Sequence, residues 1–139
     1  MKIKLSLLAL FALNFLACNK DFKVGADYKD ITVIYALLTN SDPVQYVKIT
    51  KGFFDEKQDN LLLAQNPDSF FYSNIEVKLE ELNNGNVVKT TLLPRVDLNL
   101  EGFPKDTGIF AQSPNYAYKI ADSLNASKTY RIRVKNLTS

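Results

Sequence analysis

The sequence contains no histidine, and only one of its 139 residues is a cysteine. Without histidine the chain lacks the usual general base near neutral pH and the commonest side-chain metal ligand. With one cysteine, Cys18, it forms no internal disulfide and no zinc site of several thiolates. Ser-His-Asp and Cys-His catalytic sites are therefore excluded, whereas carboxylates could still carry out acid–base or calcium chemistry. We predict a protein that is not an enzyme and that has no cofactor or metal site.

The chain also lacks an excess of charge of one sign. Lysine and arginine number 17 against 15 acidic residues. Because Lys2 and Lys4 lie in the first five positions, the chain after residue 17 carries equal numbers of basic and acidic residues. Proteins that bind nucleic acid generally present a basic patch. The sequence therefore predicts no nucleic-acid partner.

One long apolar run is present, and it lies at the start of the chain. Two lysines precede residues 5–17, which are apolar except for Ser6 and Asn14 and end in the small Ala17. A charged start, a short apolar stretch and a small residue at the cut are typical of a secretory signal peptide. A helix that spans a membrane needs about 20 apolar residues. We therefore expect residues 1–17 to be a signal peptide.

The position of Cys18 distinguishes this leader from a general one. Leu16, Ala17 and Cys18 resemble the lipobox of bacterial lipoproteins, in which the cysteine is acylated and becomes the new N-terminus; Phe15 stands where leucine is usual. The alternative is a buried helix with an ordinary core cysteine. The run is apolar almost all round, which favours a leader over a half-buried helix. The resemblance implies lipidation at Cys18 and stable membrane anchoring.

Residues 18–30 are polar and charged, without a hydrophobic period, and are typical of a tether. The Lys20-Asp21 pair resembles the acidic export signals of Bacteroidota lipoproteins, which usually carry several acids in a row. This resemblance implies an outer-membrane lipoprotein exposed at the cell surface.

From Ile31 onward the dominant period is two, which is typical of β-strands. The nearly continuous apolar residues 31–39 predict a buried strand, joined through the turn residues 40–43 to a strand at 44–53. Asn84-Gly85 between two alternating segments predicts a β-hairpin. Further strands are expected at residues 75–82, 87–93, 116–121 and 129–135, and weaker strand candidates lie at 96–100 and 108–111. One helical turn is expected at residues 60–65. Strands at this spacing predict an antiparallel β-sandwich of about six to eight strands over residues 31–139.

Residues 30–139 also resemble the N-terminal part of a group of Bacteroidota envelope lipoproteins. The order is a lipobox, an "ITVIYALLT" strand, a "VQYVKITKGF" strand, an "IEVKLEELNNGNVV" hairpin, a "GIFAQ" segment and a closing "LNASKTYRIRVKN" strand. Residues 123–134 are similar to the end of transthyretin-like sandwiches, with Ala126-Ser127 where glycine is common. The resemblance implies an Ig-like or transthyretin-like fold, and it implies an accessory or nutrient-capture role beside a TonB-dependent outer-membrane transporter. It leaves open whether residues 31–139 are the N-terminal part of a longer protein.

Two groups of aromatic residues flank the segment between the second and third expected strands. They are Phe53 and Phe54 on one side and Phe70, Phe71 and Tyr72 on the other. One reading is an exposed patch that docks a transporter or ligand. The other is core packing, with one aromatic of each pair inside and one at the rim.

Acidic residues form three further candidates. Residues 55–60 could bind calcium, although they lack EF-hand spacing; the alternative is a solvated loop. Glu80-Glu81, and Asp97 with Glu101, are candidate carboxylate pairs for glycoside hydrolysis, against the alternative of solvated surface residues. Separately, Asp122-Ser123-Leu124 matches the short O-glycosylation pattern of exported Bacteroidota proteins, which makes Ser123 a candidate modification site.

Three functional hypotheses follow. The first is a lipid-anchored β-sandwich that acts in binding or assembly at the outer membrane, with local concentration raised by its anchor. The second is an envelope hydrolase that uses only carboxylates; two close acids in a cleft would favour it. The third is a structural spacer, which the absence of an exposed apolar patch would favour.

Overall fold

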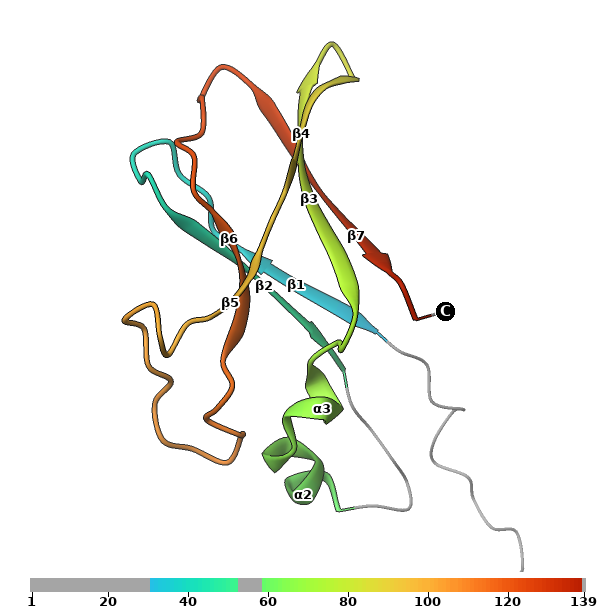
Figure 1. Ribbon diagram of the computed structural model, residues 1–139, viewed down its shortest axis with the longest axis vertical. Coiled ribbons are helices and arrows are strands. Elements are labelled where there is room, and N and C mark those ends of the chain that lie inside the picture. Colours follow the sequence, from blue (N-terminus) through green and yellow to red (C-terminus); the bar gives the residue numbers. More distant parts are fainter. Residues whose placement is uncertain (1–30, 53–58, 139) are drawn as a thin grey trace, which may run out of the picture.

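The computed structural model describes residues 31–52 and 59–138, which form an antiparallel β-sandwich (Figure 1). Sheet A has the strand order β1-β2-β6-β5, and sheet B has the order β4-β3-β7. The strands of sheet A are β1 (Thr32–Ala36), β2 (Gln45–Lys51), β6 (Tyr116–Ile120) and β5 (Arg95–Asp97). Those of sheet B are β4 (Asn86–Leu92), β3 (Ile75–Asn83) and β7 (Thr129–Asn136). The predicted all-β sandwich is confirmed.

The core lies between the two sheets and is built by alternation along the strands. In β2, Val47 and Ile49 point inward and are almost fully buried, while Lys48 between them lies on the outer face of sheet A. In β3, Val77 and Leu79 alternate in the same way. The buried cluster contains Val47, Ile49, Val77, Leu79, Leu93, Tyr118 and Ile120. Burial of this apolar surface is the main force that holds the sheets together.

Strand β1 pairs with β2 in the expected hairpin, but the prediction that it is buried is wrong. It lies at the edge of sheet A, so only β2 is beside it among the described strands. Ile34 is 46% exposed and Tyr35 is 63% exposed. A continuous apolar run usually signals a strand covered on both faces. Here the same composition leaves apolar side chains at the surface.

The hairpin between β3 and β4 forms at the predicted turn. Asn84 has φ of 50° and Gly85 has φ of 80°, so both central residues lie in the left-handed region. Turns of this kind match the twist of the flanking strands, and glycine and asparagine tolerate the conformation best. After β4, the buried Leu93 and then Pro94 carry the chain across to β5 in sheet A.

Two short helices close one end of the sandwich (Figure 1). The predicted helical turn is α2 (Asn60–Gln65), and Asp59 caps it by accepting the Leu61 N–H at 2.8 Å. The helix α3 (Pro67–Phe70) follows directly; proline at its first position suits a helix start. No sequence pattern had predicted α3, because a four-residue helix shows no period.

The segment between β5 and β6 is a long loop over residues 98–115. Of the weaker strand candidate at 96–100, only Val96 and Asp97 lie in β5, and the candidate at 108–111 is wrong. Asp97 Oδ1 accepts the N–H groups of Asn99 and Asn115, each at 3.0 Å, and so joins the two ends of the loop. In the part of the chain that the structure describes, no helix is long and apolar enough to cross a membrane.

Candidate functional site

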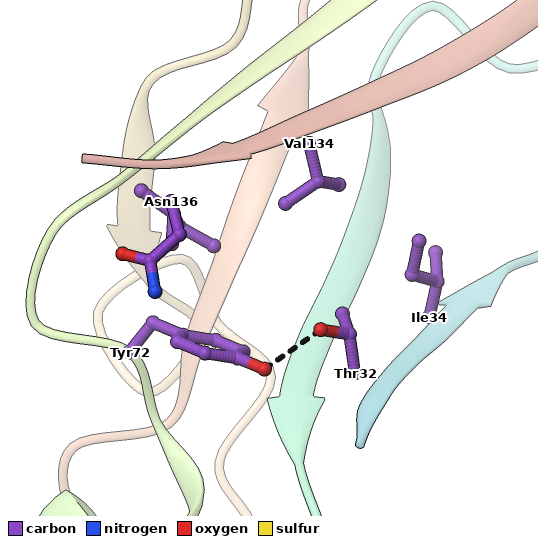
Figure 2. Close-up of a pocket in the computed structure, with 6 residues that line it drawn as sticks. Thr32, Ile34, Tyr72, Val134 and Asn136 are labelled. Atoms are coloured by element: carbon purple, nitrogen blue, oxygen red, sulfur yellow. Dashed lines mark hydrogen bonds between the residues drawn. The ribbon is translucent and has the colours of Figure 1, made fainter. Parts of the chain in front are cut away.

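An open groove lies between β1 of sheet A and β7 of sheet B. It has a volume of about 520 Å³ and is lined by Thr32, Ile34, Tyr72, Ile75, Val134 and Asn136. Figure 2 shows Ile34 and Val134 extending from their two strands toward the same space. At one end, the hydroxyl groups of Tyr72 and Thr32 form a hydrogen bond of 2.7 Å that links β1 to the segment between α3 and β3. The groove is therefore of mixed character, with the apolar Ile34, Ile75 and Val134 beside the polar Thr32, Tyr72 and Asn136.

Strand β1 differs from the other edge strands in the absence of charge. Residues 31–38 contain no charged residue and no proline. By contrast, β7 carries Arg131, Arg133 and Lys135, β4 carries Lys89, and β5 is only three residues long. Charges and short length are the usual means by which proteins prevent edge strands from pairing with other chains. Among the described strands, β1 is the edge most open to an added strand.

The structure places the aromatic candidates Phe70 and Phe71 in the interior. Each is only 7% exposed, and their ring centroids lie 4.5 Å apart. The Phe71 ring also packs edge-on against Tyr116 at 5.3 Å. These two residues are therefore not part of an exposed patch, and both members of the pair are buried rather than one. Tyr72 is half-buried in the groove, while Phe53 and Phe54 lie outside the described residues.

Exposed apolar residues follow one another along β1 and the positions on either side of it. Ile31, Ile34, Tyr35 and Leu37 are all exposed, Leu37 to 92%. The sequence signal for this surface was the apolar run itself, which cannot by itself distinguish an edge strand from a central one. We name these four residues the β1 surface.

Glu80, one of the candidate catalytic acids, is buried rather than solvated. Its side chain accepts from Arg131 Nε at 2.8 Å, and Arg133 Nη1 lies 3.3 Å from its second oxygen. Both arginines lie on β7, and Glu80 and Arg131 are directly opposite each other in the sheet. A buried carboxylate must be paired, and these contacts supply the pairing. Glu80 therefore holds β3 to β7.

The other candidate acids also make local structural contacts. Glu81 lies 3.4 Å from Lys128 Nζ, and Asp97 joins the ends of the loop over residues 98–115. Glu101 Oε2 accepts from Lys119 Nζ at 2.5 Å and from the Tyr46 hydroxyl at 2.9 Å. These hydrogen bonds, from Lys119 above all, lower the pKa of Glu101. A lowered pKa favours the ionised form, whereas a general acid needs a raised one.

The remaining candidate sites are the calcium-binding segment, the glycosylation site at Ser123 and the lipidation site at Cys18. The residues described by the structure contain no cluster of three or more potential metal-ligating side chains. Of the proposed calcium-binding segment, residues 55–58 lie outside the described residues and Asp59 caps α2. Ser123 is exposed beside a salt bridge of 3.5 Å between Lys89 and Asp122. Cys18 and the tether also lie outside the described residues, so their roles stay predictions.

Comparison of the chain with protein-family models, with curated proteins and with solved structures gives no match. The resemblance to Bacteroidota envelope lipoproteins therefore stays a prediction.

Proposed function

We propose that this protein is a lipid-anchored β-sandwich that binds a partner protein at the outer membrane, without catalytic activity of its own. The anchor rests on the sequence around Cys18, where an apolar run ends in a lipobox-like Leu-Ala-Cys. Acyl chains would hold the domain close to a membrane partner and raise its effective concentration there.

One observation in the structure supports the binding part of the proposal. Strand β1 is an uncharged edge strand with exposed apolar side chains, and one of them, Ile34, lines a groove together with Ile75 and Val134. Its free edge offers backbone N–H and C=O groups to an extended polypeptide, and the groove offers room for alternate apolar side chains. A strand from a partner protein would satisfy both.

The lining of the groove contains no charged side chain. Arg131, Arg133 and Lys135 of β7 alternate with the groove-lining Val134 and Asn136 and so lie on the opposite face of the strand, where the two arginines pair with Glu80. An uncharged extended segment would therefore enter the groove without leaving a charge unpaired. Following the sequence resemblance, we propose that this segment belongs to an outer-membrane transporter.

The structure gives less support to the two alternatives. A spacer would be favoured by the absence of an exposed apolar surface, yet the β1 surface is exposed. A carboxylate hydrolase would need two free acids in one cleft, yet Glu80 and Glu101 are both engaged by cationic partners. We therefore retain the binding module as the proposed function.

The anchor is tested by metabolic labelling of the full chain with palmitate in a Bacteroidota host. We expect label in the wild-type protein, recovery in the outer-membrane fraction, and loss of both in Cys18→Ala. Label that persists in Cys18→Ala would contradict the assignment of the lipidated residue.

The docking surface is tested by co-purification with the transporter encoded nearest to the gene. Ile34→Lys places a charge on the β1 surface, and Val87→Lys is a matched control, since the two side chains are 46% and 45% exposed. We expect Ile34→Lys to reduce recovery of the transporter at least about tenfold, because a lysine would be buried against apolar groups. Val87→Lys, on the edge strand of sheet B, should leave recovery unchanged. Equal recovery in both variants would contradict docking at β1.

A further inference from the structure

A second cavity, of about 280 Å³, lies beside β2 on sheet A and combines lysines with aromatic rings. Its lining is Tyr35, Lys48, Thr50, Lys51, Phe70, Lys105 and Phe110. We name it the lysine pocket. The lining comes from β1 and β2, from α3 and from the loop over residues 98–115, so three separate parts of the fold build it.

The ammonium groups of Lys48 and Lys105 are held in place by hydrogen bonds to neutral groups. Lys48 Nζ donates to Oδ1 of the buried Asn115 at 2.5 Å. Lys105 Nζ donates to the Ala111 carbonyl oxygen at 2.9 Å and lies 5.4 Å from the centre of the Phe110 ring. An ammonium group carries three N–H donors. Each of these two lysines therefore retains donors for a further acceptor.

The positive charge of the pocket has no carboxylate counterpart among the described residues. None of the pocket lysines forms an ion pair with a described residue. The cations that do so lie elsewhere and are Lys78, Lys89, Lys119, Lys128, Arg131 and Arg133. Burial lowers the pKa of Lys48, and the nearby positive charge of Lys105 lowers it further. Burial also lowers the pKa of Lys105. A bound anion would offset this desolvation and repulsion.

We propose that the lysine pocket binds a small organic anion with an aromatic or other apolar body. The anionic group would accept hydrogen bonds from Lys48 and Lys105, and the body would pack against the rings of Tyr35, Phe70 and Phe110. Hydrogen bonds between charged partners are stronger than neutral ones. Ligand sites typically combine apolar walls with a few placed polar groups, and this cavity is near the lower end of their usual volume.

The ligand proposal does not require the transporter proposal. Of the residues that line the lysine pocket, only Tyr35 also belongs to the β1 surface, and none lines the groove between β1 and β7. Loss of palmitate labelling or of transporter recovery would leave the binding of a small anion unaffected. Failure of the binding test below would in turn leave the anchor and the β1 surface unaffected.

The test uses the full chain purified in neutral detergent, with 2-naphthoate as the probe. Titration calorimetry compares it with the neutral 2-naphthamide and with inorganic phosphate. We expect naphthoate to bind at least about tenfold more tightly than naphthamide, because a charged hydrogen bond is lost with the amide. We also expect naphthoate to bind more tightly than phosphate, which has no apolar body.

Titrations of the wild-type protein with the three probes are sufficient to contradict the proposal. Equal binding of naphthoate and naphthamide would show that the lysines contribute nothing. Equal binding of phosphate and naphthoate would show that the apolar walls contribute nothing. No detectable binding of naphthoate at millimolar concentration would also refute the site.

Variants then locate the binding site. Lys48→Met removes one charge from the pocket and keeps most of the side-chain volume, whereas Lys135→Met removes one charge from β7. We expect Lys48→Met to weaken naphthoate binding at least about tenfold and Lys135→Met to leave it unchanged. Lys105→Met serves as a second pocket variant if Lys48→Met fails to fold. An equal effect of pocket and β7 variants would place the binding elsewhere.

Discussion

Tyr130 joins the start of β7 to the connector that precedes it. Its hydroxyl accepts the backbone N–H of Asn125 at 3.0 Å, and its ring packs against the buried core. A tyrosine that bonds backwards to the chain a few residues upstream is a recurrent feature of Greek-key sandwiches. The contact fixes the turn over residues 125–128, where Asn125 also accepts from Ser127.

We predict that Tyr130→Phe lowers the free energy of unfolding by about 1 kcal/mol, the usual net value of one hydrogen bond. The ring packing is retained in this variant, so the change isolates the hydroxyl. Urea denaturation followed by circular dichroism measures the difference. A variant as stable as the wild-type protein would show that the Asn125 N–H finds water as an equivalent partner.

The second prediction at this scale concerns Glu101 and pH. The hydrogen bonds from Lys119 and Tyr46 lower the pKa of Glu101 below its ordinary value of 4.5. The stability that the ionised carboxylate contributes is therefore complete above about pH 4.5 and is lost as pH falls through the lowered pKa. The same pairing raises the pKa of Lys119 above 10.5, so its contribution is lost only as pH rises through that higher value.

We expect Glu101→Gln to be less stable than the wild-type protein at neutral pH, and this difference to shrink as the pH falls below about 4.5. Denaturant unfolding of both proteins between pH 7 and pH 3 measures it. A stability difference that stays constant over this range would contradict the link to the Glu101 carboxylate.

The contacts of Glu80 and of the two pocket lysines could not be predicted from the sequence around each residue. The alternation in β3 indicates the outward direction of Glu80, but not that two arginines of β7 cover it. Those arginines lie about 50 positions away in the chain, and only the antiparallel register of β3 and β7 brings them opposite Glu80. Likewise, nothing local indicates that Lys48 and Lys105 share a pocket.

At the scale of single elements, the β3–β4 hairpin depends on its turn. Gly85 has φ of 80°, and a Cβ placed there would meet no atom within 4 Å. Its substitution is therefore opposed by backbone strain alone. Gly108 is equally open, but without a positive φ, and serves as a matched control.

We predict that Gly85→Ala lowers the free energy of unfolding by about 1 kcal/mol, the cost of a left-handed conformation for a residue with a Cβ. Gly108→Ala should be neutral or slightly stabilising, because alanine restricts the unfolded chain. Thermal and urea unfolding of the two variants provide the comparison. Equal effects would show that the turn relaxes to another conformation.

Strand β1 shows where element-level prediction succeeds and where it stops. Its residues are β-branched and aromatic, so its strand conformation and its hairpin with β2 followed from composition and the intervening turn. Its place in the sheet did not follow. Whether an apolar strand lies at the centre or at the edge of a sheet depends on which other strands pair with it. That pairing involves segments far apart in the sequence.

At the scale of the whole molecule, stability depends on one apolar layer between two small sheets. Ile120, Val47 and Val77 have the largest fully buried side chains among the described residues. We predict that Ile120→Ala lowers the free energy of unfolding by about 3 kcal/mol, through lost burial and the cavity left behind. For a domain of this size, that is a large part of the total stability.

Val88, which is 53% exposed on β4, provides the control. Val88→Ala should cost less than about 1 kcal/mol, since little surface is buried there. Chemical denaturation of both variants distinguishes the two positions. A small effect at Ile120 would contradict a core centred between β2, β6 and β3.

The sequence by itself determined those features of the protein that depend on neighbouring residues or on composition. Alternation specified most strands and their inward faces, Asn84-Gly85 specified a hairpin, and the absence of histidine excluded several kinds of catalytic site. Only the tertiary structure decided that Phe70 and Phe71 are interior, that β1 is an exposed edge, and that two distant lysines share one pocket. The physical reason is that a strand's faces follow from its own period of two, whereas its neighbours follow from pairing between distant segments.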